Sequence, residues 1–360
     1  MRRVCFGIAI AIAILALCAP AGMAQDGPYK VLKAAKVGGE GGFDYVYADS
    51  DGRRLYIPRS GNPARVAVYN LDTQESVGEI ANTNARGAAV DPKSGHGFAS
   101  SKPVAMWDTK TLALIKTVDV QGGPDGILFD PFNQRVWVFS HGAPNATVIN
   151  SVDGTVVGTV DLGGAPEQAV TDGKGHLYVD LEDKDKIAVV DAAALKATGT
   201  YDLAGKGGGP GGLAFDVKNH VLFATCHDPA VMVMVNSDTG KILDTLPIGT
   251  GTDGATFNPA TMEAFSSNGD GTLTIIKENN PTSFAVEQNL KTMAGAKTLT
   301  LDSKTGHILL IAAERQAPAA APPAPPAGTP PPDAGGRGRG GFGRGGAVVP
   351  GSFTILVVGK

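Results

Sequence analysis

The stretch DSDGRRLYIPRSGNPARVAVYN, residues 49–70, contains the pattern that decides the fold. Asp49 opens a turn, and two short runs rich in β-branched and aromatic residues follow it at residues 54–58 and 66–70. A connection containing Gly61, Asn62 and Pro63 separates the two runs. Short apolar runs bounded by turn residues predict antiparallel β-strands joined by a loop.

The same pattern recurs along the chain with a period of about forty residues. Each repeat contains four short β-rich runs with Gly, Asp, Asn or Pro between them, which is typical of a four-stranded antiparallel blade. No useful length of helix-period sequence interrupts the runs. Blades must cover one another's apolar faces, so the sequence predicts an all-β fold, a closed seven-bladed β-propeller. The repeats align on seven anchor residues at spacings of 42, 39, 42, 44, 42 and 44, namely Asp49, Asp91, Asp130, Asp172, Asp216, Asn258 and Asp302.

The two ends of the chain suggest how the ring closes. The last repeat stops at a third strand, Ser352 to Val358, and lacks a fourth. Residues 29–39 look like the fourth strand and the glycine connection of the other repeats. We therefore expect the N-terminal strand to complete blade seven.

These repeats resemble a known family. Arg54-Leu55-Tyr56-Ile57-Pro58 leading to residues 66–70, and His176-Leu177-Tyr178-Val179-Asp180 leading to residues 187–191, are similar to the YVTN β-propeller repeat of YncE-like proteins. The resemblance covers residues 29–313 and 351–360 and implies a WD40-like propeller that is secreted or surface-exposed. Related propellers include quinoprotein subunits and lactone hydrolases, so the fold alone does not define a function.

The N-terminus predicts export. Arg2 and Arg3 precede a short apolar run, and small residues lead to Ala24, so residues 1–24 read as a secretory signal peptide cleaved near Ala24. We expect the mature protein in the periplasm or secreted, as one domain over residues 25–360, without a transmembrane segment. Only Cys226 remains after cleavage, which excludes an internal disulfide and favours a small buried thiol. The net charge is already negative, −4, which argues against a surface that binds nucleic acid as a whole.

One segment interrupts the repeats. Residues 315–350 contain a Pro/Ala-rich half and a Gly/Arg-rich half, and neither composition can fill a core. We expect a disordered insertion in blade seven that leaves from the channel face. Arg337, Arg339 and Arg344 offer a contact for nucleic acid or another anionic polymer, although an inert solvated loop explains the composition more simply.

Candidate site residues are found at repeat positions that have diversified. The position five residues before each anchor should lie at one entrance of the channel, and the loop between the second and third strands should share that face. Arg59 lies one position earlier on the same kind of loop and is added to the set. The candidate ligand-binding residues are Asp44, Arg86, Asp125, Glu167, Asp253, Lys297, Arg59, Lys102, His141, Glu182 and His227.

Two interpretations of this set remain open. Asp44, Asp125, Glu167, Asp253, His141 and His227 could hold a divalent cation, calcium or zinc, although no compact ligand motif is present. The simpler interpretation is a solvated polar funnel in which Arg86 and Lys297 neutralise the acids. The sequence requires no cofactor.

The sequence favours a non-catalytic function. It contains no nucleophile elbow, phosphate-binding loop or metalloprotease motif. We expect an exported binding or scaffold protein that engages a partner protein, a peptide or a small ligand at the channel entrance. The alternative is an enzyme with a metal-assisted hydrolytic or quinoprotein-like centre in the channel. Nucleic-acid binding through the Gly/Arg tract is a further alternative.

Overall fold

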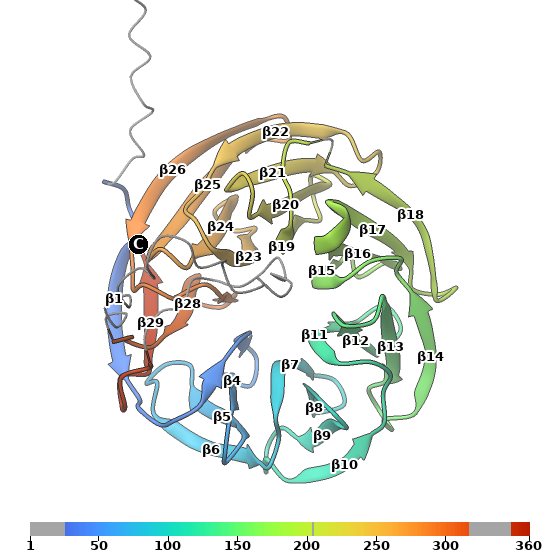
Figure 1. Cartoon of the computed structure of the whole chain (residues 1–360), viewed down its shortest axis with the longest axis vertical. Coiled ribbons are helices and arrows are strands. Elements are labelled where there is room, and N and C mark those ends of the chain that lie inside the picture. Colours follow the sequence, from blue (N-terminus) through green and yellow to red (C-terminus); the bar gives the residue numbers. More distant parts are fainter. Residues whose placement is uncertain (1–25, 204, 317–346) are drawn as a thin grey trace, which may run out of the picture.

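The computed structural model describes residues 26–203, 205–316 and 347–360. In this part of the chain, seven antiparallel sheets stand around a central axis (Figure 1). The only helical element described is a short 3-10 turn, η1 (Glu182–Lys184). The predicted seven-bladed β-propeller is confirmed.

Each blade contains four strands, and the first strand lies nearest the axis. The first three blades are β2 (Gly42–Phe43), β3 (Tyr47–Asp49), β4 (Arg54–Ser60), β5 (Arg65–Asn70) and β6 (Ser76–Ala81); β7 (Ala85–Asp91), β8 (His96–Ser101), β9 (Val104–Asp108) and β10 (Leu114–Val118); β11 (Pro124–Asp130), β12 (Arg135–Ser140), β13 (Asn145–Asn150) and β14 (Val156–Asp161). In blade one, β2 and β3 are two halves of the first strand, and both pair with β4.

The remaining blades repeat this arrangement. They are β15 (Pro166–Thr171), β16 (His176–Leu181), β17 (Lys186–Asp191) and β18 (Lys196–Asp202); β19 (Pro210–Asp216), β20 (Val221–Cys226), β21 (Val231–Asn236) and β22 (Ile242–Pro247); β23 (Thr252–Asn258), β24 (Glu263–Asn268), β25 (Thr272–Asn280) and β26 (Ser283–Lys291); β27 (Leu299–Asp302), β28 (His307–Ala312), β29 (Thr354–Gly359) and β1 (Lys30–Lys36).

The core lies between the blades. Successive side chains of a strand point to opposite faces, so alternate residues pack on the two neighbouring blades. In β4, Leu55 and Ile57 pack on blade seven, whereas Tyr56 packs on blade two. The described residues form seven such hydrophobic clusters, one between each pair of neighbouring blades. The apolar burial therefore runs around the whole ring.

The N-terminal strand closes the ring as the sequence predicts. β1 pairs antiparallel with β29, from Lys30 opposite Gly359 to Lys36 opposite Thr354, and the two strands lie side by side in Figure 1. The beginning of the described chain and its C-terminal residue also contact blade six. The Tyr29 hydroxyl and the Lys360 ammonium group both contact the carboxylate of Glu263, which is fully buried.

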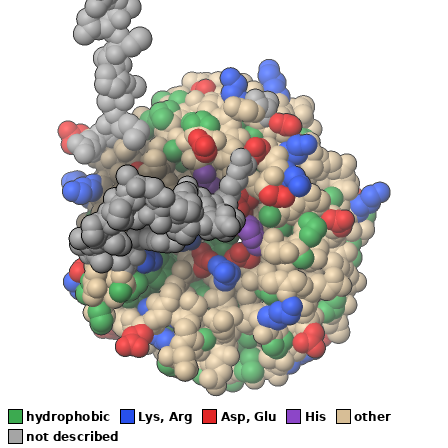
Figure 2. All heavy atoms as spheres, in the orientation of Figure 1, with side chains coloured by type: hydrophobic (Ala, Val, Ile, Leu, Met, Phe, Trp, Pro, Cys, Tyr) green, Lys and Arg blue, Asp and Glu red, His purple; other side chains and the backbone are tan. Residues whose placement is uncertain are grey.

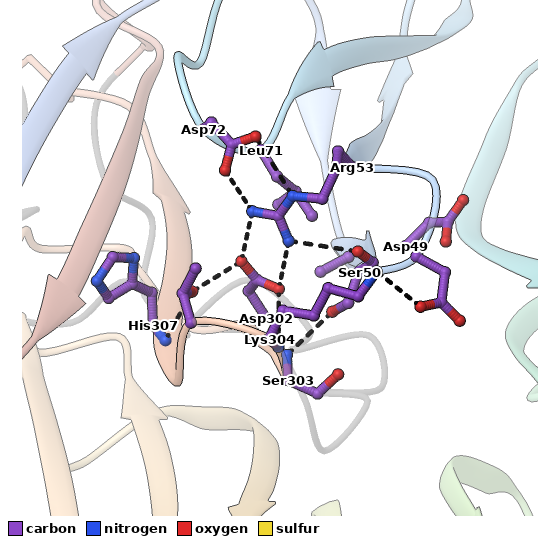
Figure 3. Close-up of polar contacts among 12 residues, drawn as sticks. Asp49, Ser50, Arg53, Leu71, Asp72, Asp302, Ser303, Lys304 and His307 are labelled. Atoms are coloured by element: carbon purple, nitrogen blue, oxygen red, sulfur yellow. Dashed lines mark hydrogen bonds and ion pairs between the residues drawn. The ribbon is translucent and has the colours of Figure 1, made fainter.

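A second link between blades one and seven lies at the turns between the first and second strands (Figure 3). Arg53 donates two parallel hydrogen bonds of 2.8 Å to the carboxylate of Asp302, and it also bonds to Asp72. Ser50 Oγ accepts a hydrogen bond of 2.9 Å from the backbone of Ser303. We call this end of the channel the anchor face, because it carries the seven anchor residues.

The expected insertion falls between β28 and β29 of blade seven. Its described ends form a single β-bridge between Arg315 and Val348. The remainder of the insertion, with the three arginines of the predicted anionic-polymer contact, lies outside the described residues, as does the predicted signal peptide. Among the residues that the structure describes, no helix is long and apolar enough to cross a membrane.

Candidate functional site

The predicted charged positions meet at the end of the channel opposite the anchor face. The first strands line the axis and run in the same direction, so equal repeat positions come together at one end. Figure 2 shows acidic and histidine side chains gathered around the centre of the molecule on this side. We call this group the channel mouth, consisting of Asp44, Arg86, Asp125, Glu167, Asp253 and Lys297, with Glu182 and His141 beside them.

The closest contacts of the two bases, Arg86 and Lys297, are with the acids of blades one and six. Lys297 contacts the carboxylate of Asp253 and lies 3.2 Å from Asp44 Oδ1. Arg86 Nη1 lies 2.8 Å from Asp44 Oδ2, and its Nε lies 3.8 Å from Asp125 Oδ1. The prediction that Arg86 and Lys297 neutralise acids is confirmed for this half of the mouth.

The prediction that the funnel acids are solvated is wrong. The side chains of the mouth acids keep only between 12% and 16% of their surface exposed, whereas Arg86 keeps 59%. Burial and the nearby charge of Glu167 raise the pKa of Asp125 to about 7. Burial raises the pKa of Asp253 to about 6, although Lys297 opposes the shift.

The half of the mouth on blades three and four contains one imidazole among several acids. His141 Nε2 lies 3.0 Å from Glu167 Oε1 and 3.0 Å from Glu182 Oε2. These two contacts raise the pKa of His141 to about 10. Asp125 offers a third carboxylate, and the ligand atoms of Asp125, His141 and Glu167 all lie within 4.8 Å of one another.

The loop of blade four places Glu182 beside this histidine. The repeat is one residue shorter here, and the chain forms η1 directly after β16. The turn ends at Asp185, whose φ of 54° is left-handed. Asp185 Oδ1 accepts a hydrogen bond of 2.8 Å from the backbone of Gly209, which fixes the end of the turn.

Blade five contributes His227 in place of a charged first-strand residue. Its position five residues before the anchor is Gly211. A Cβ atom at Gly211 would lie 2.9 Å from His227 Nε2, so glycine leaves the space that the imidazole occupies. Burial lowers the pKa of His227. The neighbouring Cys226 is fully buried and burial raises its pKa, which confirms the prediction of a structural thiol.

The two remaining candidates, Lys102 and Arg59, lie in different environments. Lys102 is exposed at the rim of the mouth, and its ammonium group contacts the backbone of Gly122. It lines a cavity of about 330 Å³ together with Asp44 and Arg86.

The placement of Arg59 on the ligand-binding surface is wrong, because this residue is only 1% exposed. Its guanidinium group lies 3.7 Å above the Phe353 ring and donates to the carbonyls of residues 38–41. Burial lowers its pKa to about 10. Arg59 therefore holds the glycine-rich entry to blade one.

Sequence reasoning missed two residues at the axis. Tyr45 donates a hydrogen bond of 2.9 Å to Glu167 Oε2. Gln168 Oε1 accepts from the backbones of Leu213 and Ala255, both at 3.0 Å, and so ties blades four, five and six together. Below the mouth, both residues line a cavity of about 300 Å³.

A signal for these two residues is present in the repeat. The position four residues before the anchor is glycine in four of the seven repeats, but Tyr45 and Gln168 stand there in blades one and four. Glycine is required where first strands crowd together, since a Cβ at Gly126 would lie 2.8 Å from the Glu167 carbonyl. A large polar residue at such a position therefore indicates a special role at the axis.

Comparisons with known proteins support the fold alone. The sequence matches no protein family and no curated protein. Among solved structures, a chain of "Crystal Structure of Mitotic Checkpoint Complex" has a TM-score of 0.66 and 11% identity, covering 86% of this chain and 95% of that chain. "Structure of U3-55K" has a TM-score of 0.65 and 8% identity, covering 80% of this chain and 92% of that chain. Identities this low show a shared propeller architecture.

Proposed function

We propose that this protein is an exported, YncE-like β-propeller that binds a positively charged group of a partner protein, peptide or small ligand at its channel mouth. The observation that carries the proposal is the unbalanced charge of the mouth. Five carboxylates, from Asp44, Asp125, Glu167, Glu182 and Asp253, meet there. Arg86, Lys297 and His141 oppose them as ion-pair partners.

Burial makes the excess of carboxylates over bases energetically unfavourable. Carboxylates that lie mostly away from water lose hydration, and like charges beside them make ionisation costly. The raised pKa values of Asp125 and Asp253 report that cost. Perturbed acids gathered in a cleft are a feature of functional sites, and a cationic ligand would relieve the repulsion. Export rests on the N-terminal sequence, and the YncE-like relationship rests on the repeat motifs.

Peptide binding tests the proposal. Full-length protein, treated with a chelator, is applied to an array of basic and acidic nonapeptides. We expect basic peptides to be retained, and Glu167→Gln to weaken their binding by about 1–3 kcal/mol through loss of a charge-assisted contact. Asp51→Asn is the matched control, since Asp51 carries the same charge on the anchor face and its side chain is 72% exposed. Binding that ignores peptide charge, or that falls equally in both variants, would refute the proposal.

A metal-assisted enzyme is the second candidate function. The grouping of Asp125, His141 and Glu167 within 4.8 Å favours it, because such a mixed donor set can hold a metal ion that activates water. A hydrolytic centre also needs room for a substrate, and the cavity of about 300 Å³ below the mouth provides a small one. Nucleic-acid binding through the Gly/Arg tract stays a prediction from the sequence.

A further inference from the structure

The negative charge of the channel mouth is distributed unevenly. Lys297 pairs with Asp44 and Asp253, and the closer contact of Arg86 is with Asp44. On blades three and four, Glu167 and Glu182 both contact the imidazole of His141. Arg86 Nε lies 3.8 Å from Asp125 Oδ1. The excess of acid is therefore concentrated around the ring nitrogen of His141.

The geometry around this nitrogen fits a metal ion better than it fits hydrogen bonds. An imidazole Nε2 carries at most one hydrogen, yet two carboxylate oxygens approach it at the same distance of 3.0 Å. One N–H can reach both oxygens only through a bifurcated hydrogen bond. Neighbouring ligands at right angles, each about 2.1 Å from a shared metal ion, lie about 3.0 Å apart.

Asp125 supplies a third donor through its Oδ1 atom. This atom is buried and has no hydrogen-bond partner among the described residues, and its contact with Arg86 Nε is a long one of 3.8 Å. Buried polar atoms normally have hydrogen-bond partners, so an oxygen without one needs an explanation such as an ion. Tyr45 donates to the other oxygen of Glu167, Oε2, which leaves Oε1 directed at His141. A hydrogen bond of this kind orients a metal ligand.

We propose that Asp125, His141 and Glu167 bind one divalent transition-metal cation, of the class of Mn²⁺ or Zn²⁺, at the blade three and four side of the mouth, with Glu182 next to the imidazole. The proposal rests on the proposed function, since it names a cation for the same acidic mouth. One imidazole and several carboxylates form a mixed nitrogen and oxygen set, which suits transition metals, whereas Ca²⁺ prefers oxygen ligands alone.

Calorimetric titration tests the site directly. Chelator-treated full-length protein is titrated with MnCl₂, ZnCl₂ and CaCl₂ in separate experiments. We expect one equivalent of Mn²⁺ or Zn²⁺ to bind at least tenfold more tightly than Ca²⁺. His141→Gln should weaken binding at least tenfold, while His220→Gln should change it less than threefold. His220 is the matched control because it is a histidine beside a carboxylate, that of Asp238 at 2.8 Å, on the opposite face of the ring.

A spectroscopic measurement on the unaltered protein tests the metal site without any substitution. Pulsed electron paramagnetic resonance of bound Mn²⁺ should show coupling to one imidazole nitrogen. Absence of saturable binding, binding that His141→Gln leaves unchanged, or a spectrum without nitrogen coupling would each overturn the site. Basic-peptide binding under chelation separates the two proposals. If peptides bind and metals do not, only the metal site fails; if metals bind and peptides do not, the peptide-binding function fails.

Discussion

The two ends of the channel use buried carboxylates of the same repeats in opposite ways. On the anchor face, burial would raise the pKa of Asp302, but hydrogen bonds from Arg53 and Thr305 lower it to about 2. The pKa of Asp91 is also lowered, because Ser151 and the turn backbone outweigh burial. At the channel mouth, burial beside other acids raises the pKa of Asp125 to about 7.

The opposite pKa shifts distinguish carboxylates that stabilise the fold from carboxylates that are available for binding. A carboxylate whose pKa falls on folding stabilises the folded state at neutral pH, whereas one whose pKa rises opposes folding there. Asp302 and Asp91 on the anchor face therefore stabilise the folded state, whereas the charged mouth carboxylates lower its free energy of unfolding. Asp130 and Glu278 are exceptions on the anchor face, because burial raises the pKa of both carboxyls, in Asp130 despite a hydrogen bond from Thr171. The direction of the pKa shift thus depends on the hydrogen-bond partners of each carboxylate and not only on the face that carries it.

Removing the closing strand should have the largest effect. Deletion of residues 25–37 leaves β29 with an unpaired edge and removes the Tyr29 contact with Glu263. We expect a loss of about 5 kcal/mol or more and aggregation through the exposed edge. Thermal unfolding and size-exclusion chromatography measure both effects. A truncated monomer that unfolds at the temperature of the full protein would show that ring closure does not depend on β1.

Arg53→Ala should cost about 3 kcal/mol, because the carboxylate of Asp302 is 3% exposed and would lose both hydrogen bonds from its partner. Arg86→Ala is the matched change at the mouth, and we expect it to cost less than about 1 kcal/mol because Arg86 is largely exposed. Urea unfolding of the two variants measures this contrast. Equal losses would remove the distinction between the two faces.

The pH dependence of stability should change in Glu278→Gln. Burial raises the pKa of Glu278 from 4.5 to about 7, beside Asp216 on the anchor face. A raised carboxyl pKa stabilises the fold below about pH 4.5, and this stabilisation is lost as pH rises through about 7. The amide stays neutral, so we expect the variant to exceed the unaltered protein by about 1–2 kcal/mol at pH 8.

Unfolding experiments between pH 4 and pH 8 would measure the effect of Glu278→Gln. The difference between the two proteins should grow across this window. A constant difference would mean that Glu278 does not titrate there.

The sequence predicts the fold better than it predicts the site, for a physical reason. The periodicity of the sequence determines the blade and the strand position of a residue. The residues of the channel mouth could therefore be placed at one end of the channel. The periodicity does not fix how far a side chain reaches across the axis. The contact between Glu167 and Tyr45 joins residues 122 positions apart, and the contact between Arg53 and Asp302 joins residues 249 positions apart.

Arg59 illustrates the same limit from the opposite side. Its repeat position suggests a loop on the mouth face, but its long side chain turns inward to the carbonyls of residues 38–41 and to Phe353. A charged residue on a loop is usually solvated, so only the tertiary contacts reveal that this one is structural. The burial of the mouth acids was missed for the same reason, since it arises where several blades converge.

The central claim is that burial beside other acids destabilises the charged mouth carboxylates, whereas anchor-face carboxylates with strong hydrogen-bond donors, such as Asp302, stabilise the fold. Urea unfolding of Asp302→Asn and Asp125→Asn at pH 7, in metal-free buffer, tests this claim most directly. We expect Asp302→Asn to lower the free energy of unfolding by about 2–3 kcal/mol through loss of a buried ion pair. Asp125→Asn should leave it unchanged or raise it by up to about 1 kcal/mol, because a buried like charge is removed. A loss in Asp125→Asn as large as that in Asp302→Asn would contradict the account.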